Sequence, residues 1–433
     1  MSEQLKVLMM GGRRAGKTSL LAGLVDSMVN GPVKDIVSVR DVTQYMDSTE
    51  SLQVKIEHLK SNIQTKKDKV FLVDDSSTSV VTDYELELYI PGTNQKMNIL
   101  FTDLNGEWFE SGVLKDSVKI EEKMEEYDVF LIAIDTPYLM EAANKDNPLC
   151  TEAINKAYNF VNDMHAFLSR VDDKEGTDAK LVIFAPLKCE LWVQNGLVDQ
   201  VINRVEEVYS THITALKSYK NIEVDIIPIQ TAGGIVFHSQ HKAYVCVSQG
   251  DEYRKCCVLD NGKRVRFANG DEREVQQTDK YILDNEAKIL TTSNLMRPYS
   301  WFKVNEPYYK PRNCEQLAYY ILQFFLAKVL FAREMEKAKG GNKQKKKKWV
   351  RYAYVISLFV NPWATIAFYL TSKYLERKFG NIGVEKMTQI VARLNNEGYI
   401  KRNTEGIKTL KESKLNIINH CCPVKVPDDY YKV

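Results

Sequence analysis

Hydrophobic residues near the amino terminus change from a continuous run to a helical spacing. Residues 5–10 form an apolar run interrupted only by Lys6 and end in Gly11-Gly12, which predicts a buried strand followed by a tight turn. Across residues 17–30, leucine, valine and methionine recur at helical spacing, and a Gly-Pro pair ends the pattern. A strand that turns directly into an amphipathic helix is the first half of a βαβ unit.

The same alternation of strand and helix patterns continues as far as residue 229. Strands are expected at 84–90, 97–104, 129–134, 180–185 and 223–229. Helices are expected at 41–65, 151–171 and 196–216. A turn signal at 91–94 joins the first two of these strands into an antiparallel hairpin. This order predicts an α/β fold whose sheet is mostly parallel, with the hairpin at one edge.

The rest of the chain has a different rhythm. Short strand patterns and Asn-Gly turns follow residue 235, so 1–235 is expected to form the core and 236–312 a β-rich insertion. The strong helical pattern at 313–338 is expected to supply the final helix of the core. Residues 339–348 form a basic linker, and 349–433 are expected to form a helical region with a winged-helix-like unit.

A stretch without charged residues, 352–372, follows the lysines of the basic linker. Three placements are open for it: buried helices of a small domain, peripheral contact of 343–372 with anionic lipid, or a membrane span. Asn361-Pro362 divides the stretch, and polar residues dilute it. These features favour buried helices.

Composition narrows the class of protein. Of the 433 residues, 44% are hydrophobic and 27% charged, which excludes a wholly disordered, collagenous or multi-span membrane chain. The formal net charge is +2, and the carboxyl-terminal charges are mixed, so nucleic acid is not an expected partner. The amino terminus has no secretory pattern, and the eight cysteines include no C-x-x-C pair. We therefore expect a cytoplasmic protein with reduced thiols, associated with membrane only if 343–372 contacts lipid.

The turn after the first strand fits the phosphate-binding pattern G-x-x-x-x-G-K-[ST] at every fixed position. Glycines let backbone N–H groups surround phosphates, and the following helix contributes the positive end of its dipole. Lys17 is expected to reach the β- and γ-phosphates, and Thr18 to bind Mg²⁺. The expected nucleotide contacts are Gly11, Gly12, Arg13, Arg14, Ala15, Gly16, Lys17, Thr18 and Ser19.

A second apolar strand ends in Asp103-Leu104-Asn105-Gly106, a D-x-x-G motif. Asp103 is expected to hold Mg²⁺, commonly through water, and the Gly106 amide to contact the γ-phosphate. A threonine before the 84–90 strand is expected to complete the metal site. Thr78 and Thr82 both fit, and Thr78 is taken as the metal ligand.

Two later segments have the character of a base-binding site. In Leu187-Lys188-Cys189-Glu190, Lys188 would lie over the base, and Glu190 would accept hydrogen bonds that guanine offers and adenine does not. Thr231 and Ala232 follow the next expected strand, where the Ala232 amide would donate to the guanine O6. The segment resembles the guanine-binding motif N/T-K-x-D but departs from it twice. Leu187 stands in place of the polar first residue, and Glu190 in place of the aspartate.

Together these motifs resemble TRAFAC-class P-loop GTPases over 1–235 and 313–338. More narrowly, the segments 103–107, 185–190 and 298–316 resemble bacterial double-GTPase domains. The resemblance implies a Ras-like αβα sandwich with a six-stranded sheet in the order 2-3-1-4-5-6. It also implies guanine nucleotide and Mg²⁺ as ligands, and a place in bacterial stress or defence systems.

Hydrolysis would depend on Lys17, Glu107 and Arg14. Glu107 stands where many relatives have a glutamine that orients water, and either it takes that role or it pairs with a basic residue. Arg14 resembles the phosphate-loop arginine of dimer-activated, guanylate-binding GTPases, which implies a homodimer through the nucleotide face. The other interpretation is a solvated surface arginine.

The resulting prediction is a Mg²⁺-dependent GTPase that switches between GTP and GDP and acts on a protein effector or partner GTPase. Two alternatives remain open: a nucleotide-binding scaffold with little hydrolysis that docks protein or membrane partners, and an ATPase. Glu107 and Leu187 are the residues that keep the scaffold interpretation open.

Overall fold

The computed structural model describes residues 4–30, 38–44, 51–73, 81–89, 96–104, 124–162, 180–219, 222–247, 253–290 and 295–314, together with isolated residues at 164, 168, 171, 316–318, 320–321, 324, 401–402 and 421–422. Its centre is a seven-stranded sheet in the order β2-β4-β5-β1-β6-β7-β8. The strands are β1 (Gln4–Gly11), β2 (Ser38–Asp41), β4 (Thr82–Tyr89), β5 (Lys96–Asp103), β6 (Val129–Asp135), β7 (Lys180–Leu187) and β8 (Ile222–Ile226).

The central sheet is mostly parallel, which confirms the predicted fold class. Strands β5, β1, β6, β7 and β8 pair in parallel, whereas β4 pairs antiparallel with β5. The six strands from β4 to β8 follow the predicted order. The predicted count of six was wrong, because Ser38–Asp41 adds a seventh strand antiparallel to β4. This edge strand is short and half exposed, so its sequence lacks the apolar run of a buried strand.

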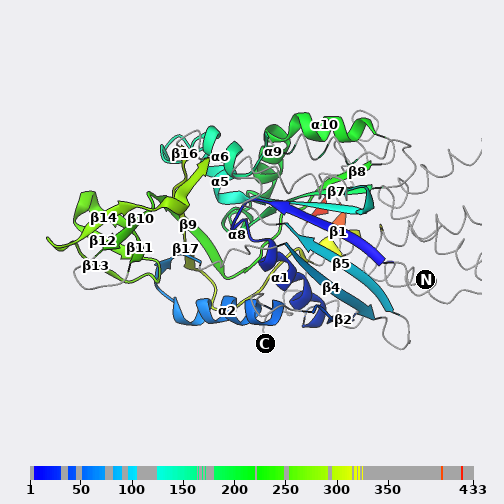
Figure 1. Ribbon diagram of the computed structural model, residues 1–433, viewed down its shortest axis with the longest axis horizontal. Coiled ribbons are helices and arrows are strands. Elements are labelled where there is room, and N and C mark those ends of the chain that lie inside the picture. Colours follow the sequence, from blue (N-terminus) through cyan, green and yellow to red (C-terminus); the bar gives the residue numbers. More distant parts are fainter. Residues whose placement is uncertain are drawn as a thin grey trace, which may run out of the picture.

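Helices cover both faces of the sheet (Figure 1). The α-helices are α1 (Lys17–Val29), α2 (Leu52–Thr65), α5 (Thr136–Glu141), α6 (Glu152–Tyr158), α8 (Glu190–Gln194), α9 (Val198–Val208) and α10 (Ser210–Ser218). The 3₁₀ turns are η1 (Met124–Glu126), η2 (Asp260–Gly262) and η3 (Asn285–Ala287). Alternate residues of β1 explain this layering, because Val7 and Met9 pack with α1 on one face, whereas Leu8 and Met10 pack with α9 and α10 on the other.

Two expected helices are shorter in the structure than their hydrophobic patterns indicate. The 41–65 helix begins only at Leu52, where the Ser51 side chain accepts a hydrogen bond from the Val54 N–H at 3.2 Å and caps the helix. The 151–171 helix is broken after Tyr158, and Phe160 has a φ of 53°. Periodicity alone does not report such local breaks.

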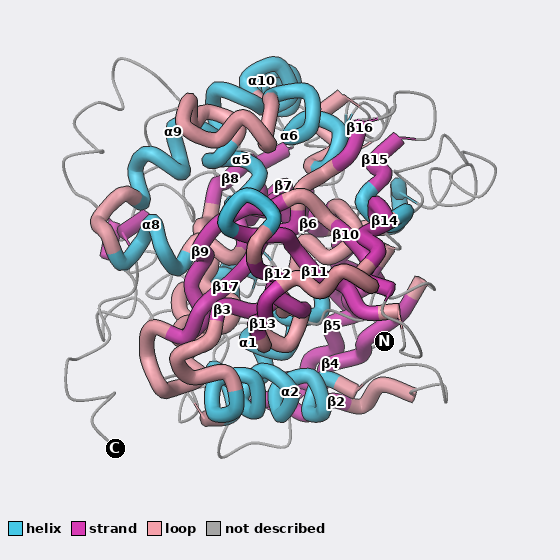
Figure 2. The backbone as a smooth tube through the Cα atoms, turned by 90° about the vertical axis from the view of Figure 1, so that its left-hand side faces the viewer, coloured by secondary structure: helices cyan, strands magenta, loops and turns pink. Residues whose placement is uncertain are grey.

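Residues 235–304 form mostly antiparallel strands. They are β9 (Ile235–His241), β10 (Tyr244–Val247), β11 (Arg254–Leu259), β12 (Arg264–Phe267), β13 (Glu272–Glu274), β14 (Lys280–Leu283), β15 (Lys288–Leu290), β16 (Leu295–Met296) and β17 (Tyr299–Val304). One sheet has the order β13-β12-β11-β10-β14, and a smaller one joins β17 and β9 to β3 (Val70–Phe71). The smaller sheet lies between the five-stranded sheet and the core (Figures 1 and 2). We call the part from β10 to β16 the β insertion.

The carboxyl-terminal part is described only in pieces. Residues 314, 316–318, 320–321 and 324 are helical, and Leu317, Ile321 and Phe324 pack into the core beside α1. β18 (Lys401–Arg402) pairs with β19 (Cys421–Cys422). The expected basic linker 339–348, the 343–372 segment and most of the expected 349–433 region lie outside the described residues. Within the described part, no helix has the length and hydrophobicity needed to cross a membrane.

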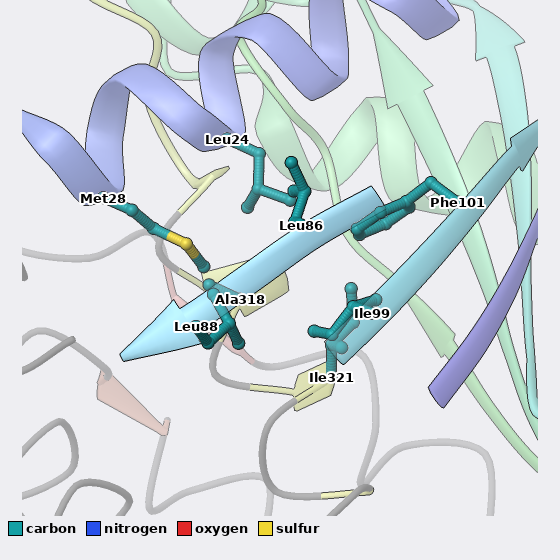
Figure 3. A pocket seen from close by; sticks show the side chains of 8 residues that line it. All are labelled: Leu24, Met28, Leu86, Leu88, Ile99, Phe101, Ala318 and Ile321. Carbon is teal, nitrogen blue, oxygen red and sulfur yellow. The ribbon is translucent and has the colours of Figure 1, made fainter. Parts of the chain in front are cut away.

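A small apolar pocket lies where this helical segment meets α1, β4 and β5 (Figure 3). It offers no charged or polar side chain to a nucleotide, and we interpret it as a packing gap between the sheet and the last described helical residues. The lining residues are Leu24, Met28, Leu86, Leu88, Ile99, Phe101, Ala318 and Ile321.

Candidate nucleotide-binding site

The candidate site lies at the carboxyl edge of the parallel strands. The arrow of β1 points toward the β insertion (Figure 1), and the register sets Met9 beside Asp103 and Gly11 beside Ala133. The ends of β1, β5, β6 and β7 therefore meet at one edge. Ligands of open α/β sheets bind at this kind of edge.

Glycines let the loop after β1 pack closely against its neighbours. A Cβ at Gly11 would stand 2.5 Å from the Ala133 carbonyl oxygen, and one at Gly12 would stand 2.6 Å from the Tyr158 carbonyl oxygen. Gly16 caps α1 with a φ of 105°, a conformation that other residues rarely adopt. Ala15 of this loop and Ser19 in the first turn of α1 are both buried.

Lys17, Thr18 and Asp103 form one group at the start of α1, in which Lys17 and Asp103 are buried and Thr18 is half-buried. The Lys17 ammonium donates to the carbonyl oxygens of Gly11 at 3.1 Å and Gly12 at 3.3 Å. It also lies 3.7 Å from Asp103 Oδ1, while the Thr18 hydroxyl donates to Asp103 Oδ2 at 3.2 Å. Burial raises the pKa of Asp103, and the neighbouring Lys17 and Thr18 counter only part of that rise.

The oxygen atoms of this group suit a hard divalent cation. Asp103 Oδ1 is buried without a hydrogen-bond partner, and the Thr18 hydroxyl lies against the other oxygen of the same carboxylate. Mg²⁺ is typically bound by one or two protein oxygens together with phosphates and water. Among the described residues, no cluster of three or more His, Cys, Asp or Glu side chains could hold a metal. A metal at Asp103 would therefore depend on other oxygens for the rest of its coordination.

The two arginines of the loop have different surroundings. The Arg13 carbonyl accepts a hydrogen bond from the Tyr158 hydroxyl. Arg14 has a φ of 63°, and its guanidinium donates to Glu286 of the β insertion at 2.9 Å. The structure thus sets Arg14 at the loop, as its sequence position requires, but engaged with a carboxylate from a distant part of the chain.

Lys188 connects the phosphate loop to the base side of the site. Its ammonium donates to the Arg14 carbonyl oxygen at 2.5 Å and to Asp135 Oδ2 at 2.9 Å. Asp135 is fully buried at the end of β6, and burial raises the pKa of its carboxyl group while Lys188 opposes that rise. The Lys188 ammonium also lies 5.8 Å from the centre of the Phe302 ring.

Glu190 and Ala232, both predicted to contact the base, lie together. Glu190 Oε1 accepts hydrogen bonds from the backbone N–H groups of Ala232 at 2.9 Å and Gly233 at 3.3 Å. Glu190 and Thr231 are buried, and burial raises the pKa of Glu190 although these hydrogen bonds and Lys188 oppose it. Leu187 is buried in the core at the end of β7.

Three predicted site residues, Thr78, Gly106 and Glu107, lie outside the described residues. Conversely, four groups beside the loop were not predicted: Asp135, Tyr158, Glu286 and Arg297. Asp135 could have been found, because it ends an apolar strand next to β1. The other three carry no sequence motif, and only the tertiary fold sets them at the loop.

The charges of the site favour an anion rich in oxygen atoms. Lys17 and Lys188 both donate to carbonyl oxygens of the loop before α1, and Asp103 lies at the position suited to a cation. Such a combination can bind phosphates and a divalent ion together.

The comparison with protein families agrees with this interpretation. A family model described as Double-GTPase 2 matches residues 7–223. No curated protein matches the chain. Among solved structures, the S. cerevisiae Ski7 GTPase-like domain bound to GTP is 12% identical, with a TM-score of 0.30 and coverage of 70% of this chain and 71% of that chain. The cytosolic domain of T. maritima FeoB in its GMPPNP form is 13% identical, with a TM-score of 0.21 and coverage of 52% and 56%, respectively.

Proposed function

The chain belongs to the Double-GTPase 2 family, and on this premise we propose that it binds GTP with Mg²⁺ and hydrolyses it to GDP and phosphate as a molecular switch. The observation that carries the proposal is the group of buried Lys17, buried Asp103 and half-buried Thr18 at the first strand-to-helix turn. A buried lysine, a hydroxyl and a carboxylate have few structural uses together at a helix N-terminus. They suit a metal-bound triphosphate.

In this proposal the chain's own groups divide the work. The Lys17 ammonium, which now donates to two loop carbonyls, moves its hydrogen bonds to phosphate oxygens. Loop N–H groups and the α1 N-terminus bind the same phosphates. Thr18 and Asp103 hold Mg²⁺, which when bound neutralises charge on the phosphates. Arg14 is proposed to add positive charge to the transferring phosphate, and Glu107 to orient the attacking water.

Selection of guanine is assigned to Glu190 and Ala232. A guanine at this position takes the Ala232 N–H for its O6, and it offers Glu190 its own N–H groups in exchange for the backbone hydrogen bond that is lost. Adenine offers no such donors to Glu190. Because Glu190 is buried, an unpaired carboxylate there would be costly, and this cost makes the choice between the two bases sharp.

One observation favours the scaffold alternative over hydrolysis. Arg14, the loop arginine proposed to act on the transferring phosphate, is paired with Glu286. A protein in which that pair persisted would bind nucleotide and turn it over slowly. Binding and hydrolysis therefore need separate measurements.

Thermal unfolding with GTP, GDP or ATP, each with and without Mg²⁺, tests the binding part. GTP at 100 times its Kd is expected to stabilise the chain by about 2.7 kcal/mol, and ATP at the same concentration by far less. The variant K17A is expected to lose the stabilisation. The matched control K145A, at an exposed lysine away from the site, is expected to keep it. Equal stabilisation by ATP would show that Glu190 does not select guanine.

Phosphate release under saturating Mg²⁺ and GTP tests the catalytic part. Release that disappears in D103N identifies the chain as a GTPase. Stabilisation by GTP without release identifies a scaffold. The bacterial stress or defence role, the homodimer through the nucleotide face, the protein effector and the lipid contact of 343–372 remain predictions.

A further inference from the structure

The β insertion reaches the phosphate loop through one carboxylate. Glu286, in the η3 turn, accepts a hydrogen bond from Arg14 Nη2 at 2.9 Å. The same oxygen, Oε2, also accepts from the ammonium of Lys255 on β11. The contact of Arg14, Glu286 and Lys255 therefore joins residues that are far apart in the sequence.

The backbone that carries Glu286 is held firmly in place. Asp284 accepts hydrogen bonds from the Glu286 N–H at 3.0 Å and from the Tyr299 hydroxyl. The Glu286 carbonyl accepts from Arg297 Nη2 at 3.3 Å. Arg297 is buried and stacks 4.9 Å from the centre of the Tyr158 ring. Because the Tyr158 hydroxyl bonds the phosphate loop, η3 is fixed relative to that loop.

The Arg14 backbone is fixed as well, so only its side chain is free to exchange partners. Its carbonyl accepts the 2.5 Å hydrogen bond from Lys188, and its left-handed φ sets the direction of its side chain. Its guanidinium is partly exposed, as is the Glu286 carboxylate. An ion pair of this exposure is weak enough to be exchanged for a phosphate.

Glu286 is negatively charged at every physiological pH. Burial raises the pKa of its carboxyl group, but the Lys255 hydrogen bond and the charges of Arg14, Lys255 and Arg13 outweigh burial and lower the pKa to about 2. This charge is paired with Arg14 and Lys255, so its effect on a phosphate at the loop is to compete with that phosphate for the Arg14 guanidinium.

We propose that Glu286 holds Arg14 away from the nucleotide phosphates, so that the β insertion restrains hydrolysis from within the same chain. This inference rests on the proposed GTPase function and adds its regulation. Lys255 competes with Arg14 for the Glu286 carboxylate and thereby weakens the restraint. Hydrolysis requires Arg14 to exchange Glu286 for phosphate, and Glu286 is a positioning residue rather than a catalytic one.

Single-turnover and steady-state phosphate release by E286Q, with Kd for GTP measured separately, test the proposal. E286Q keeps the shape of the side chain and removes its charge, so kcat is expected to rise roughly two- to fivefold, the range of a weak exposed ion pair. The matched control E274Q, at an exposed glutamate of the insertion, is expected to leave kcat unchanged.

Two further variants separate restraint from a merely structural role. K255M removes the competitor of Arg14, so kcat is expected to fall while Kd for GTP changes little. R14A/E286Q is expected to have the same kcat as R14A alone, because no arginine remains to be released. Unfolding curves of all variants check that they fold.

A kcat for E286Q at or below that of the unchanged protein overturns the inference, and so does a rise that persists in R14A/E286Q. Release by E286Q where the unchanged protein shows none supports it. GTP binding without release in both proteins contradicts the proposed hydrolysis itself, and the inference that rests on it is overturned with it. Failure of GTP to stabilise the unchanged protein contradicts the proposed function itself and is thus distinguishable.

Discussion

Lys188 and Asp135 form a largely buried ion pair beside the phosphate loop. Their atoms lie 2.9 Å apart, and the side chains are 14% and 1% exposed. Removing one partner of such a pair leaves an uncompensated buried charge. K188M is therefore expected to lower the free energy of unfolding by about 3 kcal/mol in urea denaturation.

The double variant K188M/D135N is the control for this prediction. It removes both charges, so most of the lost stability is expected to return, and the cycle gives a coupling energy for the pair. GTP affinity is expected to remain low in both variants, because the bond from Lys188 to the loop is lost. If K188M/D135N were as unstable as K188M, the loss would come from packing rather than charge.

Glu190 gives a pH dependence whose sign follows from its environment. Burial raises its pKa above the usual value, so between the usual and the raised value the folded state holds more protons than the unfolded state. Its contribution to stability is present below the usual pKa and is lost as pH rises through the raised one. The stability of the unchanged protein relative to E190Q is therefore expected to fall as pH rises from about 4.5.

Urea unfolding of the two proteins from pH 4.5 to pH 8 measures this difference. Glutamine keeps an oxygen that can accept from the Ala232 and Gly233 N–H groups, so E190Q changes charge with little change of contacts. A difference that stayed constant over this range would show that Glu190 has an ordinary pKa.

Residues at the site were predictable where a motif fixes both type and spacing. The Gly11–Thr18 loop, Asp103, Lys188, Glu190 and Ala232 meet as their spacing indicated. Glu286 was not predictable, because a lone glutamate in a turn of an insertion has no pattern. Its meaning depends on a fold that brings it to Arg14.

At the scale of elements, the turn after β8 shows how backbone space defines the base side of the site. Gly233 has a φ of 67°, and a Cβ there would stand 1.8 Å from the Lys310 carbonyl oxygen. Gly196 has a similar φ of 72° but an open surrounding. The two glycines share one backbone demand and differ only in crowding.

G196A is expected to cost about 1–2 kcal/mol from its left-handed backbone alone. G233A is expected to cost a further 1–3 kcal/mol from crowding, and to weaken GTP binding because Ala232 is displaced. Denaturation curves and GTP titration of both variants check this. Equal losses would mean that the turn relaxes away from Lys310 without difficulty.

Elements were predictable where hydrophobic periodicity was strong and unbroken. The buried strands of the core fall within a few residues of their expected positions, as with Val129–Asp135 and Lys180–Leu187. The edge strand Ser38–Asp41 was missed because only one of its four residues, Val39, is hydrophobic. The break after Tyr158 depends on tertiary hydrogen bonds of Asn159 to Asp135, which local sequence does not report.

At the scale of the whole molecule, the β insertion and the core share a continuous interface. The Leu72 N–H donates to the Ala268 carbonyl at 2.9 Å, and Lys69 pairs with Asp271 at 2.7 Å. Trp301 is fully buried between the two parts, beside Cys257 and Val70. The insertion therefore has one apolar cluster of its own, around Cys246, Cys256 and Phe267, and a second, around Trp301, that it shares with the core.

We expect the insertion and the core to unfold together. In native-state hydrogen exchange with increasing denaturant, amides of β11 and of β1 are expected to lose protection at the same concentration. Earlier loss in β11 would show that the insertion is a separate folding unit. As a reference, the exposed edge strand β14 is expected to exchange before both.

The contact between Glu286 and Arg14 also has a reciprocal consequence. If nucleotide phosphates draw Arg14 away from the insertion, then a molecule that binds the insertion and alters Glu286 changes the affinity for nucleotide. Nucleotide in turn changes the affinity for that molecule by the same factor. The insertion would thus be an allosteric site, at which a second molecule changes nucleotide binding without contacting the nucleotide.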